Sequence, residues 1–300
     1  MQDLIQHLIN GLGLGAIYAL IALGYTMVYG VLQMINFAHS DVYMVGAFAA
    51  YYAARWFNLE SMPGVVSFAI LLLAAITGCA LLGLLIERFA YRPLRNAPKL
   101  NILITAIGVS LLLEYSGQVI FGADPKVFPE VLNNTPLFEM AGVSFKLFDF
   151  LVIGVGLVAM AVLHFLIYHT KQGRAMRAVS VNPRVASILG VNVDRTIVFT
   201  FVLGSALAGV GSVLVGVKYP KIEPLMGMMI GLKAFVAAVL GGIGNIMGAV
   251  LGGLIMGLSE EMVVAYLSST YRDAVAFGIL ILILIVRPSG LLGRNQTEKL

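Results

Sequence analysis

Charged residues are unusually scarce in this sequence. Only 11% of its 300 residues are charged and 60% are hydrophobic, whereas soluble domains carry roughly 25% charged and about 45–50% apolar residues. So few charged side chains cannot cover a water-facing surface. This excludes a soluble enzyme, a secreted binding domain, a disordered tail and a coiled coil. What remains is an all-α, polytopic integral membrane protein, whose outer surface faces hydrocarbon.

Cysteine and nucleotide-binding motifs are also scarce. The single cysteine, Cys79, excludes an internal disulfide and a thiolate metal site, and we expect it to pack as a small core residue. No Gly-x-x-x-x-Gly-Lys-Ser/Thr motif occurs, so the chain cannot hold ATP phosphates by itself. No Ser/His/Asp or Cys/His set can be assembled on the water side. We therefore expect no catalysis, no metal and no cofactor bound by this chain.

Long apolar runs predict the membrane spans, since a helix needs about 20 apolar residues to cross a bilayer. Residues 8–38 carry no formal charge and provide one helix plus a hairpin into a second span at about 40–58. The first seven residues lack Lys, Arg and a cleavage-like site, so the first span is expected to be retained. About seven to eight spans in one transmembrane domain, 1–300, are predicted. The further spans fall at 64–86, 100–121, 150–170, 196–217 and about 270–286.

Basic residues in short loops predict the orientation. The segments after the third and fifth spans are strongly basic, whereas loop 122–149 between them is acidic. The basic segments are therefore cytoplasmic, loop 122–149 is external and the N-terminus lies outside. The C-terminal tail should be inside. The basic residues concerned are Arg88, Arg92, Arg95 and Lys99; then Lys171, Arg174, Arg177, Arg184 and Arg195, opposed only by Asp194; and in the tail Arg287, Arg294 and Lys299.

The uncharged segment 234–259 conflicts with this count, because an ordinary crossing there would place the tail outside. The conflict disappears if the segment enters and returns on the same side. Glycine weakens a helix by about 1 kcal/mol relative to alanine, and four candidate path residues at its centre would break one: Gly241, Gly242, Gly244 and Asn245. Either a broken, re-entrant element lines a water-filled path, or a continuous helix packs on rows of small residues. Those rows contain Gly244, Gly248, Gly252, Gly253 and Gly257.

The cytoplasmic loop 173–195 has the pattern of a docking element. Asn182 followed by Pro183 predicts a helix N-cap and first position, and Gly190 predicts the stop. Arg174 and Arg177 share a helix face. We expect two short helices beneath the membrane, with one apolar and one cationic face, that receive force from a partner; a loop that only fixes topology is the alternative. The apolar stripe comprises Val185, Ile188 and Leu189, and Arg184 and Asp194 belong to the same element.

Polar residues inside the predicted spans are the remaining candidates. Glu114 lies about 20 Å along the fourth span, where it binds a substrate ammonium group, hydrogen-bonds to a neighbouring helix, or opens on the outer mouth. Asn36, His39 and Asp41 either cap the second span, together with Ser40, or line the inner end of the path. His164 and His169 are expected at the cytoplasmic interface.

Uphill transport by such a chain needs an ion gradient or another subunit. Ion-driven carriers usually bury ionisable relays, and Glu114 is the one plainly interior ionised candidate that this reasoning finds. A single carboxylate is a thin basis for ion coupling, so the docking loop favours partner ATPases. An ion-coupled secondary transporter and a channel remain alternatives.

Four stretches carry a family resemblance: 35–47 (INFAHSDVYMVGA), 173–195, 231–253 beginning GLKAF, and 287–293 (RPSGLLG). They resemble permease subunits of ATP-driven importers for branched-chain amino acids, of the LivH type. Nearly the whole chain shares the resemblance, although Ser40 stands where the family usually has glycine. The resemblance implies a bacterial inner-membrane permease that works with a sister permease, two ATP-binding subunits holding ATP and Mg²⁺, and a periplasmic binding protein that selects the solute; no nucleic acid is implied. A urea or short-amide permease of the same family is the nearest alternative.

Overall fold

The computed structural model describes residues 2–95, 97–132, 136–140 and 143–293. Arg294 and Lys299, which the orientation argument used, lie outside these residues. Within the described part, seven helices are long and apolar enough to cross a membrane, which confirms the predicted fold class. They are α1 (Gln2–Leu32), α3 (Gly64–Ile86), α4 (Lys99–Phe121), α5 (Leu147–His169), α8 (Val193–Lys218), α10 (Ile246–Tyr266) and α11 (Arg272–Val286), the last of which reaches span length only together with the helical turn that begins at Ser269.

Two further helices complete the bundle, α2 (His39–Trp56) and the shorter apolar helix α9 (Met226–Gly241). The expected spans correspond to helices, but α9 begins at Met226, before the predicted segment 234–259, so only the second part of this helix was predicted. The loop predicted to be cytoplasmic forms α6 (Lys171–Val181) and α7 (Pro183–Ile188). The remaining elements are the short helical turns η1 (Leu59–Ser61), η2 (Glu87–Tyr91), η3 (Arg92–Leu94) and η4 (Ser269–Tyr271), and the antiparallel strand pairs β1 (Lys126–Val127) with β4 (Lys221–Ile222) and β2 (Pro136–Met140) with β3 (Val143–Lys146).

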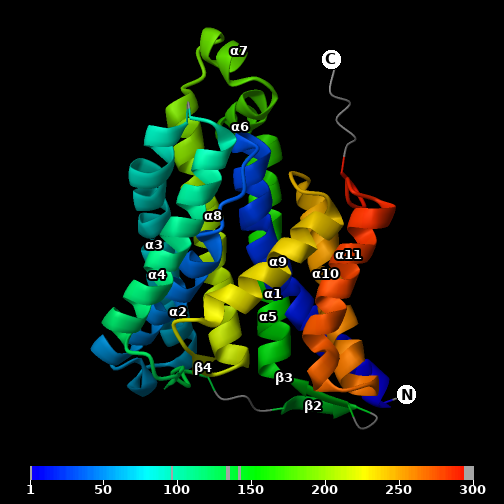
Figure 1. The fold of residues 1–300 in the computed structure, drawn as a ribbon. Coiled ribbons are helices and arrows are strands. Elements are labelled where there is room, and N and C mark those ends of the chain that lie inside the picture. Colours follow the sequence, from blue (N-terminus) through cyan, green and yellow to red (C-terminus); the bar gives the residue numbers. More distant parts are fainter. Residues whose placement is uncertain (1, 96, 133–135, 141–142, 294–300) are drawn as a thin grey trace.

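The helices form two halves that run in opposite directions. α1 to α4 make the first half and α8 to α11 the second, and Figure 1 shows α1 and α8 pointing opposite ways. Each half repeats the contacts of the other: α1 packs on α10 as α8 packs on α3, and α9 lies on α1 as α2 lies on α8. In each half a non-helical segment, 33–38 or 219–225, precedes the short helix. The arrangement is an inverted repeat, typical of transport proteins.

Small residues hold the two halves together. A Cβ built on Gly253 of α10 would lie 2.5 Å from the Ala19 nitrogen of α1, and one on Gly209 of α8 would lie 2.7 Å from the Ala75 oxygen of α3. Backbones that approach so closely leave no room for side chains. Cys79 lies nearby, fully buried, with its Sγ 3.2 Å from the Val42 oxygen, so its predicted role as a core residue is confirmed.

The two ends of the bundle differ in the loops that they carry. In Figure 1, α6 and α7 lie at the upper end together with the described end of the chain, whereas strands β2 and β3 and the N-terminus lie at the lower end. This agrees with the predicted orientation, in which loop 173–195 and the C-terminal tail share one side and loop 122–149 lies on the other. Which end faces the cytoplasm stays a prediction.

Segment 234–259 is broken, and the continuous-helix alternative is wrong. α9 ends at Gly241, and Gly242 and Gly244 have φ angles of +103° and +92°, which favour glycine. Asn245 caps α10, since its side-chain oxygen accepts a hydrogen bond from the Gly248 nitrogen at 3.1 Å. The segment enters and returns as a helical hairpin.

The break does not lie in the middle of the membrane, where the tip of a re-entrant loop would lie. The Leu240 and Gly241 oxygens accept hydrogen bonds from the Leu291 and Leu292 nitrogens at 2.8 and 2.9 Å. The turn therefore lies beyond the end of α11, against the last described residues. The break is a hairpin turn at one end of the bundle.

The glycine rows of this segment make close contacts at every position but one. Gly248 and Gly252 pack on the backbone of α9, and Gly253 and Gly257 pack on that of α1. The prediction of a close backbone approach at Gly244 is wrong, because the nearest atoms to a Cβ there would lie 3.8 Å away. Its positive φ is what requires glycine.

Candidate functional site

A cleft of about 180 Å³ opens between α4, α9 and the starts of the short helices. Ser40 is in the first turn of α2 and Met228 in the first turn of α9, so both short helices begin here. A Cβ on Gly231 would overlap Ser40, which explains why α9 carries glycine at this crossing. The lining residues are Tyr25, Phe37, Ser40, Ile107, Ser110, Leu111, Glu114, Met228, Gly231, Leu232 and Phe235.

Two of the candidate carboxylates meet at this cleft. Asp41 is fully buried behind it and accepts a hydrogen bond of 2.5 Å from the Ser110 hydroxyl. Glu114 lies one helical turn beyond Ser110 on α4, is 9% exposed and lines the cleft. Among the described residues Glu114 has no hydrogen bond or ion pair, so its predicted bond to a neighbouring helix is not observed. Sequence reasoning missed Ser110, whose spacing of four from Glu114 was the available signal.

The other two candidates at the start of α2, Asn36 and His39, make packing contacts inside the bundle. The Asn36 side chain accepts a 3.0 Å hydrogen bond from the Tyr91 hydroxyl. His39 is 1% exposed and packs edge-on against the Tyr25 ring at 4.8 Å between centroids. Neither lines the cleft. The capping interpretation of Ser40 and Asp41 is also wrong, because α2 begins after Ala38 with no side-chain cap.

A buried cluster of charges joins α1, α9, α10 and α11, and the sequence reasoning missed it. The Lys233 ammonium lies 3.1 Å from Glu260 and 2.7 Å from Asp273, and the Tyr18 hydroxyl donates to Glu260 at 3.0 Å. The Arg272 guanidinium lies 3.7 Å from the same carboxylate. Glu114 is therefore not the only interior ionised residue, and that prediction was wrong.

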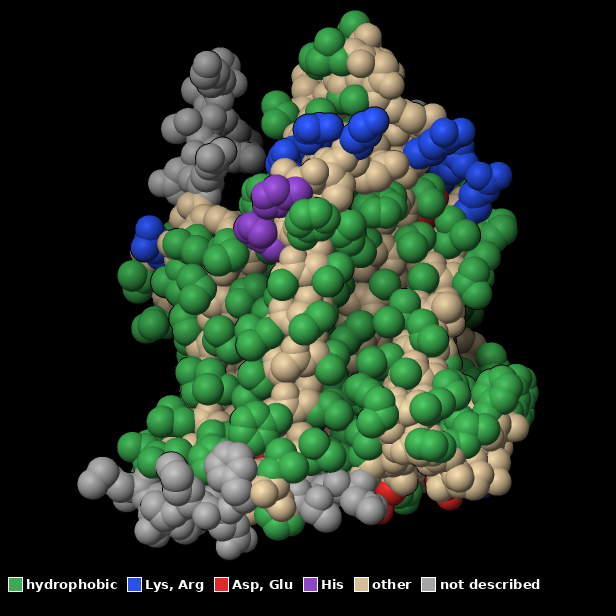
Figure 2. Space-filling model, turned by 180° about the vertical axis from the view of Figure 1, so that it is seen from behind, with side chains coloured by type: hydrophobic (Ala, Val, Ile, Leu, Met, Phe, Trp, Pro, Cys, Tyr) green, Lys and Arg blue, Asp and Glu red, His purple; other side chains and the backbone are tan. Residues whose placement is uncertain are grey.

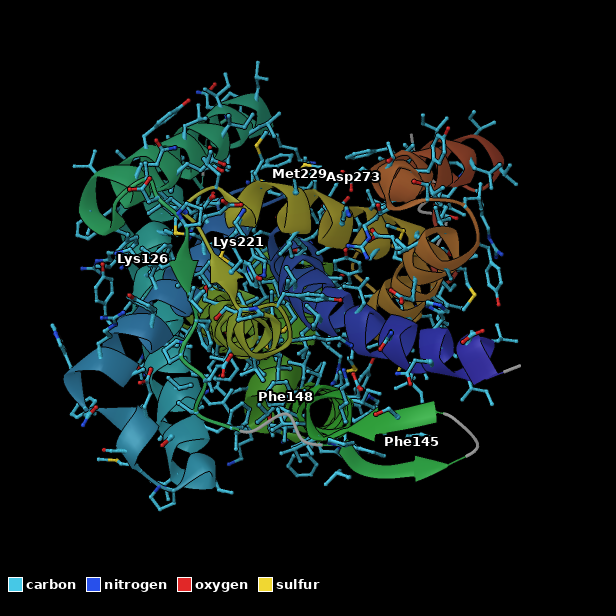
Figure 3. The ribbon with its side chains drawn as sticks, turned by 90° about the horizontal axis from the view of Figure 1, so that it is seen from below. Lys126, Phe145, Phe148, Lys221, Met229 and Asp273 are labelled. Carbon is cyan, nitrogen blue, oxygen red and sulfur yellow. The ribbon has the colours of Figure 1, made fainter. Side chains whose placement is uncertain are left out.

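The signal for this cluster was present in the chain. A lysine within an apolar run needs a partner inside the membrane, and Lys233 stands one residue before the segment that was read as uncharged. Figure 3 shows Asp273 beside Met229 of α9, on the side where α4 and α11 flank that helix. Of this cluster, Asp273 is half exposed on that side, whereas Lys233 and Glu260 are buried.

The predicted docking loop has the expected local structure. The Asn182 side-chain oxygen accepts hydrogen bonds from the Arg184 and Val185 nitrogens at 3.0 and 3.1 Å, so the N-cap before Pro183 is confirmed. Gly190 has a φ of +82° and follows the end of α7, as predicted for the stop. The stripe on this loop is exposed, at 50% for Val185, 84% for Ile188 and 75% for Leu189. Together with the exposed Val181, these residues form what we call the α7 patch.

Two charged residues, Arg177 and Asp194, tie this loop to the bundle, and a third, Arg174, does not. Arg177 donates a hydrogen bond to the Ile167 oxygen and lies 5.4 Å from the Tyr168 ring centroid, so it anchors α6 to α5. Arg174 is exposed. Asp194 pairs with Arg92 at 3.0 Å and with Arg95, which also reaches Glu87. The two predicted arginines thus differ, because only Arg174 faces outward.

Comparison with known proteins gives matches over nearly the whole chain. The family model for the permease component of branched-chain amino acid transport systems matches residues 7–284. The chain is 43% identical to the LivH permease protein of the high-affinity branched-chain amino acid transport system of Salmonella typhimurium, over 98% of this chain and 97% of that protein. It is equally similar, over the same shares, to the BraD permease protein of Pseudomonas aeruginosa. Identity to a branched-chain amino acid transport permease protein LivH of Methanocaldococcus jannaschii is 31%, over 91% and 88%.

Proposed function

The chain belongs to the permease components of branched-chain amino acid transport systems, and from that membership we propose that it forms one side of a membrane path for leucine, isoleucine and valine. It is a non-catalytic, multi-pass subunit of an ATP-driven transporter of the bacterial inner membrane, and it works with a partner ATPase and other subunits. The finer composition is part of the proposal. It comprises one sister permease, two ATP-binding subunits that hold ATP and Mg²⁺, and a periplasmic binding protein.

The observation that carries the proposed path is the unpaired Glu114 at the cleft. A carboxylate at this depth cannot face lipid without a cost of at least about 2.5 kcal/mol. α4 and α11, which flank the cleft face, are also the least buried of the seven long helices, with 22% and 11% of their apolar windows buried. The sister permease therefore packs against the face formed by α4, α9 and α11, and the path runs between the two subunits.

The cleft suits an aliphatic amino acid better than urea. Its apolar lining, with Ile107, Leu111 and Leu232, accommodates a branched hydrocarbon side chain. Glu114 faces the ammonium group of the solute, and the first turns of α2 and α9 offer backbone N–H groups near its carboxylate. Urea or a short amide has no such charge to match. We expect only brief contacts here, because the periplasmic protein selects the solute.

The α7 patch is the proposed contact with the ATP-binding subunits. Its side chains are apolar and project at the end of the bundle, where they bury area only against a partner. Closure of the ATPases pushes α6 and α7; the Arg177 anchor passes the movement to α5, and the contacts of Asp194 pass it to α8 and the end of α3. The movement switches the path between its inward-facing and outward-facing forms.

The docking role is tested by placing a charge on the patch. Ile188→Glu should leave the permease in the membrane but remove the ATP-binding subunits from the purified complex and abolish ATP-driven leucine uptake. Val127→Glu is a matched control, since Val127 is 72% exposed on a strand at the other end of the bundle. Full recovery of the ATP-binding subunits with Ile188→Glu would contradict the docking role. Uptake of urea but not leucine by the unmodified complex would contradict the proposed solute class.

A further inference from the structure

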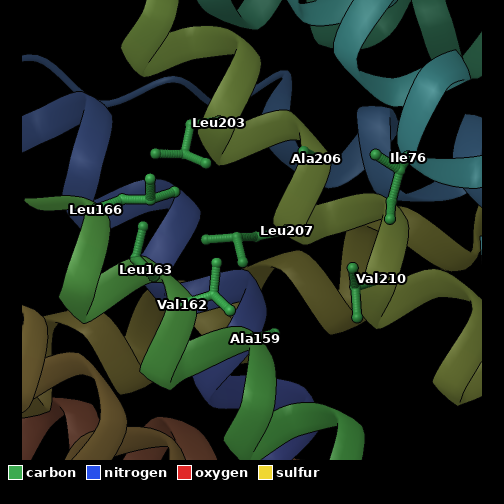
Figure 4. Close-up of a pocket in the computed structure, with 9 residues that line it drawn as sticks. All are labelled: Ile76, Ala159, Val162, Leu163, Leu166, Leu203, Ala206, Leu207 and Val210. Carbon is green, nitrogen blue, oxygen red and sulfur yellow. The ribbon is translucent and has the colours of Figure 1, made fainter. Parts of the chain in front are cut away.

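An apolar cleft lies between α5, α8 and α3 and has no part in the proposed path. Figure 4 shows its walls, with Val162 and Leu166 from α5, Leu203 and Leu207 from α8, and Ile76 from α3. Its volume is about 180 Å³, the volume of roughly six water molecules at about 30 Å³ each. Water needs polar partners in a cavity, and every residue that lines this cleft is apolar. The cleft therefore suits a hydrocarbon chain rather than water.

The cleft opens away from the face assigned to the sister permease. Seen from below in Figure 3, the start of α5, marked by Phe148, lies across the bundle from α9 and Met229. Neither the solute path nor the second permease covers it. In a bilayer the cover of this face is lipid.

A rim of exposed basic side chains lies directly above the cleft. His169 follows Leu166 by three residues on the same side of α5, and Lys171 and Arg174 follow in the first turn of α6. All three are exposed, and within the described residues neither Lys171 nor Arg174 forms an ion pair. No Asp or Glu occurs from residue 150 to residue 193. Figure 2 shows a row of Lys and Arg above a histidine pair on this face, with apolar side chains below.

We propose that the cleft and this rim bind an anionic phospholipid of the inner leaflet. One acyl chain fills the cleft, and the phosphate lies against Lys171 and Arg174. Arginine and lysine both bind phosphate strongly, and basic pockets between helices on the cytoplasmic side of a membrane suit anionic head groups. The positive end of α6 begins at the same rim and adds to the attraction. The bound lipid lies at the junction of α5 and α6, next to the Arg177 anchor.

The test is lipid retention by the purified complex of this chain with its partner subunits. The complex is equilibrated in mild detergent with equal amounts of phosphatidylglycerol and phosphatidylcholine of the same acyl chains, and retained lipid is measured by native mass spectrometry. Each basic side chain near an anionic lipid is worth about a fivefold gain, so about a 25-fold preference for phosphatidylglycerol is expected. Equal retention of the two lipids by the unmodified complex would overturn the proposal without any variant.

Variants separate the rim from the cleft. Lys171→Gln with Arg174→Gln should bring retention of the two lipids close to equality, whereas Arg184→Gln with Arg287→Gln removes the same charge from the same end and should keep the preference. Ala159→Phe fills the cleft without changing charge and should release the bound lipid. A preference that survives loss of Lys171 and Arg174, or lipid retention unchanged by Ala159→Phe, refutes the site.

Discussion

Lys233 is the residue whose removal should be felt most in the fold. Its side chain is 7% exposed, and its Glu260 partner is 0% exposed. Breaking a buried ion pair by removing one partner costs about 3–5 kcal/mol, because the remaining charge is left without compensation. Arg272 stays 3.7 Å from Glu260, so we expect Lys233→Met to lie at the lower end, about 3 kcal/mol.

The other members of the cluster should rank below it. Asp273 is 50% exposed, and a pair with a solvent-exposed partner is worth about 0–1 kcal/mol, so Asp273→Asn should be mild. Tyr18→Phe removes one hydrogen bond from a buried carboxylate, which should cost about 1–3 kcal/mol. Lys233→Met combined with Glu260→Gln removes both buried charges and should recover most of the loss.

The assay is the thermal midpoint of the detergent-solubilised complex, followed by size-exclusion chromatography after heating. One kcal/mol corresponds to about 2–4 °C in a domain of 150–250 residues, so Lys233→Met should lower the midpoint by about 6–12 °C and Asp273→Asn by at most about 4 °C. The double variant should return to within a few degrees of the unmodified complex. Equal shifts for Lys233→Met and Asp273→Asn would refute the reasoning. So would a double variant whose midpoint falls by the sum of the shifts of Lys233→Met and Glu260→Gln measured separately.

Three further outcomes are expected. Gly253→Ala places a Cβ 2.5 Å from the Ala19 nitrogen and should sharply reduce the amount of permease in the membrane, whereas Gly154→Ala meets nothing within 4 Å and should be neutral; equal amounts of both would contradict the close contact of α1 and α10. Asn182→Ala removes an N-cap worth about 1 kcal/mol and should lower leucine uptake per ATP hydrolysed severalfold, while Asn182→Asp, which can still cap, should not; equal loss would contradict the role of the cap. Glu60→Cys should react with a membrane-impermeant thiol reagent on intact cells and Arg184→Cys only after permeabilisation, with the buried Cys79 silent; the reverse pattern would contradict the orientation.

The sequence predicted what depends on neighbours along the chain. The long spans follow from uninterrupted apolar runs, and the N-cap at Asn182 follows from the two residues that come after it. Both were correct because helix formation and capping are local. The start of the short helix α9 was missed because the uncharged run was counted only from the residue after Lys233.

Contacts between distant segments were beyond that reasoning. Lys233, Glu260 and Asp273 come from three helices, and the sequence alone gives no distance between them. Glu260 lies between the segment 234–259 and the span predicted at about 270–286, so it was not among the candidates. The pairing of Asp41 with Ser110 joins α2 to α4 in the same way. The predictions for the glycines were correct only in part, because Gly244 is needed for its positive φ angle rather than for close packing.

The meeting of α2 and α9 has a consequence for the direction of transport. An α-helix carries roughly half a positive charge at its first turn and half a negative charge at its last. These two helices begin at the same cleft and leave it in opposite directions (Figure 1), so their axial dipoles oppose and largely cancel across the bilayer. The dipoles of these two helices therefore add no net drive toward either compartment for an amino acid that lies between them. These two helices therefore give the path no direction of their own, and in the proposed function the direction of transport has to come from the partner subunits.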